Sequence, residues 1–194
     1  YPGARFDSES YSYAYSFSPE LLQEWNWAEH YSGQPENEKY LNFVADKLDL
    51  RRDIGFGANV VAMTFDEAGA EWMVDTESGE RYIAPFVVAA AGILSVPVEP
   101  DIPGIDSFTG TSLFTSRWPR EEVDVSGKRV GVIGAGSTAV QLIPEIAPDV
   151  AQLVAFQRSP AYTLPWSVRA LESGELDEMK AHYGEIRAAQ REHP

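Results

Sequence analysis

The chain has 194 residues, 44% of them hydrophobic, which is enough to bury a sizeable core in one large domain or two small ones. Its net charge of -15, from 30 acidic and 15 basic side chains, disfavours nucleic acids and anionic membrane surfaces as partners. The lack of cysteine excludes disulfides, thiolate nucleophiles and zinc-thiolate sites within these residues, and no apolar run approaches the ~20 residues of a membrane span. We therefore expect a soluble, cytoplasmic protein with no nucleic-acid or membrane partner.

The N-terminal part of the sequence predicts a loop followed by two helices. Residues 1–17 are aromatic and polar without helical periodicity, which is typical of a loop. Ser18 and Pro19 supply an N-cap and a first-turn proline, so we expect a helix from there through Ala28. A second helix is expected from Pro35. Its predicted apolar face follows the i, i+3, i+7 spacing: Leu41, Val44 and Leu48.

After residue 54 the pattern changes to short β-rich runs separated by turn residues. Three of these runs, at 59–65, 71–76 and 80–83, predict a small antiparallel meander. The fourth run, 86–90, is apolar without alternation, a pattern typical of a strand buried on both faces. We expect this run at the centre of a parallel sheet.

Residues 93–128 are rich in proline and glycine and predict a stiff linker with a domain boundary. A strand at 129–133, a helix at 137–147 and a strand at 152–156 then predict a βαβ unit. A last, amphipathic helix is expected at 171–190. One side of it carries Met179, Tyr183 and Ile186.

A glycine turn joins the first strand of the βαβ unit to its helix. The pattern is Gly134-x-Gly136-x-x-Ala139, with the helix starting at Ser137. In dinucleotide-binding folds the first glycine permits the tight turn, the second lets the backbone approach the pyrophosphate, and a small third residue lets the helix pack on the strand. Because the pattern sits between a strand and a helix, it predicts a pyrophosphate at the helix N-terminus.

The second strand of this unit ends in a basic residue. Arg158 follows Gly136 by 22 residues, and Ser159 comes next. An acidic residue at this place would bind the ribose 2′-hydroxyl of NAD, whereas arginine favours the 2′-phosphate of NADP. We therefore predict NADP(H) rather than NAD(H). The alternative is a glycine turn in another kind of α/β protein, with Arg158 merely solvated.

The remaining chemistry-bearing residues predict no further site by themselves. The three histidines have no partners at metal-ligand spacing, so no metal is predicted: His30, His182 and His193. No Gly-x-Ser-x-Gly elbow supports hydrolysis. Spacing alone leaves Arg5-x-Asp7 open between a local ion pair and a catalytic pair.

A longer motif precedes the glycine turn. The linker reads Phe108-x-Gly110-x-x-x-Phe114-Thr115-x-x-Trp118-Pro119. It resembles the F-x-G-x-x-x-H-x-x-x-W-P fingerprint of Baeyer-Villiger monooxygenases, which are class B flavoprotein monooxygenases. Residues 1–10, 17–27 and 156–158 are also similar to this family, particularly to its phenylacetone monooxygenase-like branch.

The resemblance implies FAD and NADP(H) as cofactors, and a ketone and O₂ as substrates. NADPH would reduce FAD, and one oxygen atom of O₂ would be inserted next to the ketone carbonyl to give an ester or lactone. Asp7 resembles the aspartate that orients a catalytic arginine beside the flavin, and Arg5 its neighbour on the nicotinamide side. The implied FAD contacts are Tyr13 and the backbone of Val60. The implied NADP contacts are Gly134, Gly136, Ser137, Thr138, Ala139, Gln141, Arg158 and Ser159.

The sequence departs from the family pattern at one fingerprint position. Phe114 replaces the histidine, so the hydrogen bonds of that side chain cannot form. This keeps a rival open, an N-hydroxylating or sulfoxidising flavin monooxygenase. A nonenzymatic NADP-binding module is the alternative from another class.

The expected fold is α/β, an incomplete Rossmann-like flavoprotein with two dinucleotide-binding domains and a small antiparallel meander. We assign residues 1–95 to a partial FAD domain, 96–128 to the linker and 129–194 to the start of the NADP domain. The glycine motif for FAD is expected before Tyr1 and the catalytic arginine after Pro194. The chain is thus interpreted as an internal fragment, inactive by itself.

Overall fold

The computed structural model describes residues 1–92, 94–164 and 168–192. The chain forms two compact units, one made of residues 1–48 and 110–194 and the other of residues 49–109. This division differs from the linear one expected from the sequence, because the N-terminal segment joins the same unit as the glycine turn. The assignment of sequence ranges to FAD and NADP domains stays a prediction.

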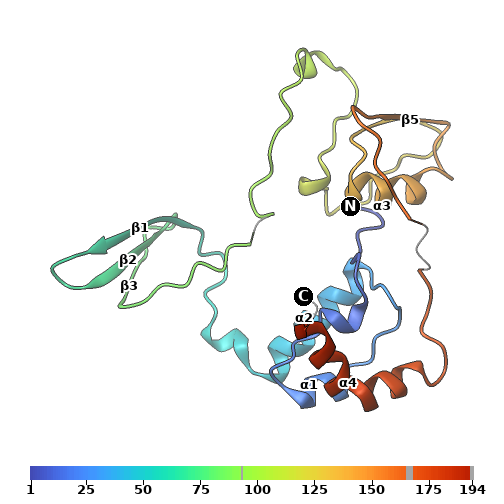
Figure 1. Cartoon of the computed structure of the whole chain (residues 1–194). Helices are drawn as coiled ribbons and strands as arrows, with labels where there is room; N and C mark the ends of the chain where they lie inside the picture. The colour runs from blue at the N-terminus through green and yellow to red at the C-terminus, as the bar shows by residue number, and fades with distance from the viewer. Residues whose placement is uncertain (93, 165–167, 193–194) are drawn as a thin grey trace. The chain divides into compact units, whose positions relative to one another are not determined.

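The larger unit contains a small helical core. Helices α1 (Pro19–Glu24), α2 (Gln34–Lys47) and α4 (Glu175–Glu192) lie near one another in Figure 1. Their shared core consists of Ala14, Leu21, Leu22, Trp27, Tyr40, Val44 and Tyr183. Two short 3-10 helices, Ser10–Ser12 and Thr115–Arg117, also belong to this unit.

Helix α1 begins as predicted, with the Ser18 hydroxyl accepting from the Leu21 N–H at 3.3 Å. It ends at Glu24, so the expected continuation through Ala28 is wrong. Trp25 is extended, and both it and Trp27 pack against Tyr40, with ring centroids 5.4 and 5.0 Å away. Residues two apart face different ways on a helix, so this shared contact requires extended chain.

Helix α2 begins one residue before the expected Pro35, but its buried face is not the predicted one. Tyr40 and Val44 are buried, whereas Leu41 is 53% exposed and Leu48 is 40% exposed. The aromatic residues of the 11–27 segment pack on the Tyr40 side of the helix, and this selects the face that enters the core. Only Val44 of the three predicted positions is therefore correct.

Helix α4 begins later than the expected residue 171 and is bound to the N-terminal loop by Arg187. The guanidinium of Arg187 donates to the backbone carbonyls of Tyr11, Ser12 and Ala14, at 2.7, 3.1 and 2.6 Å. Burial lowers the pKa of Arg187. Of the predicted apolar side, Tyr183 is buried while Met179 and Ile186 are half-buried.

A second module of the larger unit is the βαβ motif, which confirms the sequence prediction. Strands β4 (Arg129–Ile133) and β5 (Gln152–Phe156) pair in parallel, with Ile133 opposite Phe156. Helix α3 (Ser137–Ile146) connects them. The core of the module consists of Val132, Ala139, Leu142 and Ile146.

The smaller unit is the antiparallel meander predicted from the sequence. Strands β1 (Val60–Asp66), β2 (Glu71–Thr76) and β3 (Arg81–Ala84) pair in the order β1-β2-β3 and lie side by side in Figure 1. In the sequence, one short 3-10 helix precedes the three strands at Leu50–Asp53 and another follows them at Ile105–Ser107.

The fourth β-rich run, residues 86–90, is not a strand in the structure. Phe86 is 85% exposed and Val88 is 89% exposed, so the expected buried central strand is wrong. A central strand needs hydrogen-bonding neighbours on both sides. The parallel pair in the described part of the chain, β4-β5, belongs to the other unit.

The first turn of α4 depends on Glu175, whose carboxylate accepts two bonds from Arg169, at 2.6 and 2.7 Å, and one from the Glu172 N–H at 2.6 Å. The hydrogen bonds from Arg169 and then Glu172 lower the pKa of Glu175 from 4.5 to about 2. Because this pKa is depressed, the contribution of the pair to stability is complete above pH 4.5 and is lost as the pH falls toward 2.

We expect Arg169→Met to move the pKa of Glu175 back toward 4.5, because it removes the largest cause of the shift. An NMR titration of the Glu175 side chain measures this change. Lys47→Met is the matched control, because Lys47 pairs with Glu24 instead, and it should leave the Glu175 titration unchanged. A wild-type Glu175 that titrates near 4.5 would contradict the assignment.

Candidate functional site

The glycine turn lies at the carboxyl edge of the β4-β5 pair. The Gly134 N–H donates to the Phe156 carbonyl at 2.9 Å, which extends the parallel ladder by one bond. Gly134 has φ of +120°, a conformation that favours glycine. The chain then passes through extended Gly136, the N-cap residue of α3. The turn therefore directs the N-terminus of α3 along the edge where β5 also ends.

The N-terminus of α3 is open to an anion. Gly136 provides no capping side chain, and the first turn of the helix contains no acidic residue. The first backbone N–H groups of a helix have no partner within the helix, and its dipole favours negative charge there. Ser137 is exposed, and Thr138 is half-buried. These groups fit a pyrophosphate in chemistry and position.

The space around Gly136 distinguishes this glycine from Gly131 in the preceding strand. A Cβ added at Gly136 would meet no atom within 4 Å, and its φ of -76° is ordinary for any residue. At Gly131, in contrast, a Cβ would lie 3.2 Å from Cε2 of Phe156. Packing within the protein explains a glycine at 131 but not at 136. A glycine at 136 is the choice that leaves a ligand free to approach the backbone.

A cavity of about 220 Å³ adjoins the turn. It lies between the turn, α3 and the segment after β5. Its lining is mostly apolar, with two polar side chains: Gly134, Ala135, Ala139, Val140, Ile143, Pro144, Ala155, Gln157, Ala161 and Thr163. The buried Ala139 packs with Val132, as the small third residue of the motif requires.

Arg158 and Ser159 follow β5 and are both exposed. Because β4 and β5 are parallel, Arg158 emerges at the same edge as the glycine turn. The structure records no ion pair or hydrogen bond of its guanidinium within the described ranges. The side chain is therefore free to bind an added phosphate.

The N-terminal segment contacts α3 close to this turn. The Tyr1 hydroxyl donates to Gln141 Oε1 at 2.8 Å, and Gln141 Nε2 donates to the Arg5 carbonyl at 3.1 Å. The Arg5 guanidinium pairs with Glu29 at 3.6 Å, and Asp7 is exposed. The local ion pair that spacing left open thus joins Arg5 to Glu29 rather than to Asp7.

The other predicted residues fall into two groups. Tyr13 belongs to the larger unit and stacks on Phe6, with ring centroids 3.7 Å apart. Trp118, half-buried, packs against the βαβ core. Gly110, Phe114 and Pro119 lie in the same unit. Val60 and Phe108 lie in the smaller unit.

Sequence reasoning missed Gly3. It has φ of +76°, and a Cβ there would lie 2.4 Å from the Gln141 carbonyl oxygen and 2.6 Å from Glu145 Cγ. The Pro2-Gly3 pair is typical of a turn. The contact with a helix 138 residues further along the sequence has no local signal.

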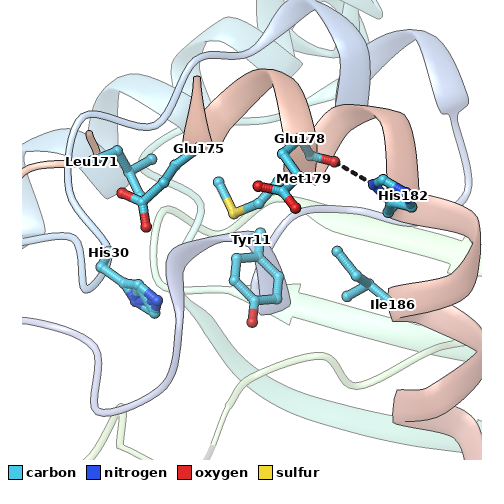
Figure 2. Close-up of a pocket in the computed structure, with 8 residues that line it drawn as sticks. All are labelled: Tyr11, His30, Leu171, Glu175, Glu178, Met179, His182 and Ile186. Carbon is cyan, nitrogen blue, oxygen red and sulfur yellow. Dashed lines mark hydrogen bonds between the residues drawn. The ribbon is translucent and has the colours of Figure 1, made fainter. Parts of the chain in front are cut away.

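A second cavity, of about 280 Å³, lies between the N-terminal loop and α4. Figure 2 shows its lining: Tyr11, His30, Leu171, Glu175, Glu178, Met179, His182 and Ile186. Its polar groups already have partners in part. Glu175 binds Arg169, and His182 Nδ1 lies 2.9 Å from the Glu178 carbonyl. Burial raises the pKa of the Tyr11 hydroxyl. We see no acid-base pair set up for catalysis among these side chains.

Within residues 1–92, 94–164 and 168–192, no helix has the length and apolar character that crossing a bilayer requires. No group of three or more histidine, aspartate or glutamate side chains in these ranges could hold a metal ion.

Comparison with known proteins shows which family the chain resembles over nearly its whole length. The family model for pyridine nucleotide-disulphide oxidoreductases matches residues 6–193. The acetone monooxygenase (methyl acetate-forming) of Gordonia sp. is 43% identical over 96% of this chain and 35% of its own length. A Baeyer-Villiger monooxygenase of Pseudooceanicola batsensis is 45% identical over 96% of this chain and 34% of its own.

A solved structure agrees with the sequence relatives. Oxidized steroid monooxygenase bound to NADP is 51% identical, with a TM-score of 0.88 over 95% of this chain and 35% of that one. The chain thus spans about a third of the length of the relatives it matches. These matches confirm the resemblance to Baeyer-Villiger monooxygenases and the α/β, Rossmann-like class.

The contact between Gly3 and α3 predicts a selective loss of stability. Gly3→Ala should lower the free energy of unfolding by about 2–4 kcal/mol, from left-handed strain plus overpacking. Gly127→Ala is the control, since Gly127 has φ of +65° but no atom within 4 Å of an added Cβ. It should cost about 1 kcal/mol, from strain alone. Urea unfolding compares the two, and equal losses would contradict the contact.

Proposed function

Because the chain belongs to the pyridine nucleotide-disulphide oxidoreductase family, we propose that its Gly134–Gly136 turn binds NADPH within a flavin-dependent monooxygenase of Baeyer-Villiger type. The open approach to the Gly136 backbone carries this proposal, together with the exposed Arg158 at the same edge. The family name refers to disulfide chemistry, but these 194 residues contain no cysteine. No redox-active disulfide can therefore form within these residues.

The proposed reaction inserts one oxygen atom of O₂ next to the carbonyl of a ketone to give an ester or lactone. Bound NADPH supplies a hydride and bound FAD activates O₂. The residues around the glycine turn fit NADPH. The N–H groups of Ser137 and Thr138 would hold the pyrophosphate, Gly136 would leave it room, and Arg158 with Ser159 would bind the 2′-phosphate. The 220 Å³ cavity lies beside them.

Fewer residues of this chain are proposed to contact FAD than to contact NADPH. Tyr13 and Val60 are 47% and 49% exposed, so each leaves surface for a ligand, but they lie in different units. The only other Gly-x-Gly in the chain, Gly55-Phe56-Gly57, precedes strand β1 rather than a helix and lacks the helix N-terminus that a pyrophosphate needs. The proposal therefore assigns the FAD pyrophosphate to residues outside this chain.

Arg5 and Asp7 are the proposed catalytic residues. Arg5 is on the nicotinamide side, where its charge is balanced by Glu29 at 3.6 Å. Asp7 is exposed, so its carboxylate is available to orient a cationic side chain. The segment that carries both residues is attached to α3, which begins at the nucleotide turn.

One observation favours the rival reaction, N-hydroxylation or sulfoxidation. Phe114 stands in the fingerprint where the Baeyer-Villiger pattern has histidine, and its ring can neither donate nor accept a hydrogen bond. Product analysis with a ketone and with an amine, on the protein at full length, separates the two reactions. An ester or lactone supports the first proposal, and a hydroxylamine supports the second.

The role of Gly136 predicts a loss of binding without a loss of stability. We expect Gly136→Ala to weaken NADP⁺ binding at least about tenfold, because the methyl group occupies the space of the phosphates. The midpoint of thermal unfolding should stay equal or rise slightly, since alanine fits the backbone and meets no atom. Calorimetric titration and a melting curve test both points. A variant that melts early, or binds normally, contradicts the role.

The role of Arg158 predicts a change in cofactor preference. Arg158→Ala should weaken NADP⁺ binding about tenfold to a hundredfold, the value of a charge-assisted bond to phosphate, and change NAD⁺ binding by less than about threefold. Arg129→Ala is the control, because Arg129 lies at the opposite end of β4 and the charge change is the same. Equal wild-type affinity for the two cofactors would refute the assignment.

A further inference from the structure

The side chain of Gln141 binds the backbone of Arg5 on both of its polar groups. Gln141 Nε2 donates to the Arg5 carbonyl at 3.1 Å, and Oε1 accepts from the Arg5 N–H at 3.4 Å. Oε1 also accepts from the Tyr1 hydroxyl at 2.8 Å. Because the Arg5 carbonyl can only accept, the amide nitrogen must face it, and this sets the orientation of the amide.

On its other side, the same segment pairs as a short strand. Arg5 forms an antiparallel bridge with Gly33, and the Phe6 N–H donates to the Ser32 carbonyl at 3.1 Å. The amide of Gln141 thus occupies the place that a neighbouring strand would take. The Arg5 backbone therefore lies between Gly33, which pairs with it as a neighbouring strand, and the Gln141 amide, which forms the hydrogen bonds that a second strand would form.

The backbone of Gln141 is equally close to the segment. Gly3 approaches its carbonyl oxygen so closely that a Cβ would lie 2.4 Å away. The segment therefore contacts Gln141 of α3 through both its backbone and its side chain. Gln141 lies four residues after Ser137, so both are on one face of the helix, with Ser137 at the nucleotide turn.

We propose that Gln141 is a positioning residue that holds the Arg5 backbone in register with α3, so that a nucleotide bound at the glycine turn sets the position of Arg5. This inference rests on the proposed NADPH site and deepens it. It also changes the role that the family resemblance implies for Gln141. Its amide is committed to Arg5 and Tyr1, so it acts on the nucleotide site through the protein backbone.

The test is an NMR titration of the 194-residue chain with NADP⁺, following backbone amide resonances. In the wild type, the amides of Gly136 and Ser137 and that of Arg5 should shift with one common dissociation constant. In Gln141→Met, the turn amides should still shift with an affinity within about threefold of the wild type. The NADP⁺-induced shift of the Arg5 amide resonance should fall at least about fivefold. The variant lacks the hydrogen bonds between the Gln141 side chain and the Arg5 backbone that couple Arg5 to α3.

Two further variants make the test specific. Gln152→Met is the matched control, an exposed glutamine at the start of β5, and it should leave the Arg5 shift intact. Gln141→Glu keeps the size and the acceptor but loses the donor to the Arg5 carbonyl, and it should also reduce the Arg5 shift. If Gln141→Met fails to fold, the Arg5 shift in Gln141→Glu tests the proposal instead.

The outcomes that overturn the proposal differ from those that overturn the NADPH site. An Arg5 amide that still shifts fully in both Gln141 variants shows that the nucleotide reaches the segment without Gln141. A folded variant whose turn amides lose affinity more than about tenfold shows that Gln141 contacts the nucleotide directly. If the turn amides of the wild type do not shift at all, the NADPH site itself is wrong, and the positioning role has no ligand to act on.

Discussion

The parallel pairing of β4 with β5 is the constraint on which the candidate site depends. Parallel strands end at the same edge, so the glycine turn after Ile133 and the basic residue after Phe156 emerge together. The hydrogen bond from the Gly134 N–H to the Phe156 carbonyl extends the β4-β5 pairing by one residue, into the turn. The turn is therefore oriented by the ladder itself, and α3 starts with its unpaired N–H groups along that edge.

The second constraint is the attachment of the N-terminal segment to α3. The segment crosses to the helix because Gly3 lacks a side chain and Gln141 offers an amide to the Arg5 backbone. Arg187 and the Trp27–Tyr40 contacts hold the rest of the N-terminal region in the helical core. Two regions far apart in the sequence thus form one unit that carries both the nucleotide turn and the proposed catalytic residues.

The family matches and the geometry support each other at different levels. The matches identify the scaffold over nearly the whole chain, but they reach only a third of each relative. The geometry explains why particular residues suit a nucleotide: an uncapped helix, an open glycine and an exposed arginine. Phe114 is the fingerprint position where chain and family pattern differ, because its ring offers no hydrogen-bond donor where the pattern has histidine.

Local chemistry in the sequence was sufficient to predict the βαβ unit, the glycine turn, the three-stranded meander and the start of α1. Each of these depends on neighbours in the chain: a capping serine, a turn glycine, an alternating strand. Tertiary contacts decided the end of α1, the face of α2 that is buried, and the exposed state of residues 86–90. They also decided the role of Gly3 and Gln141. These features depend on contacts between residues far apart in the sequence, such as Gly3 with Gln141, and no local pattern encodes such a contact.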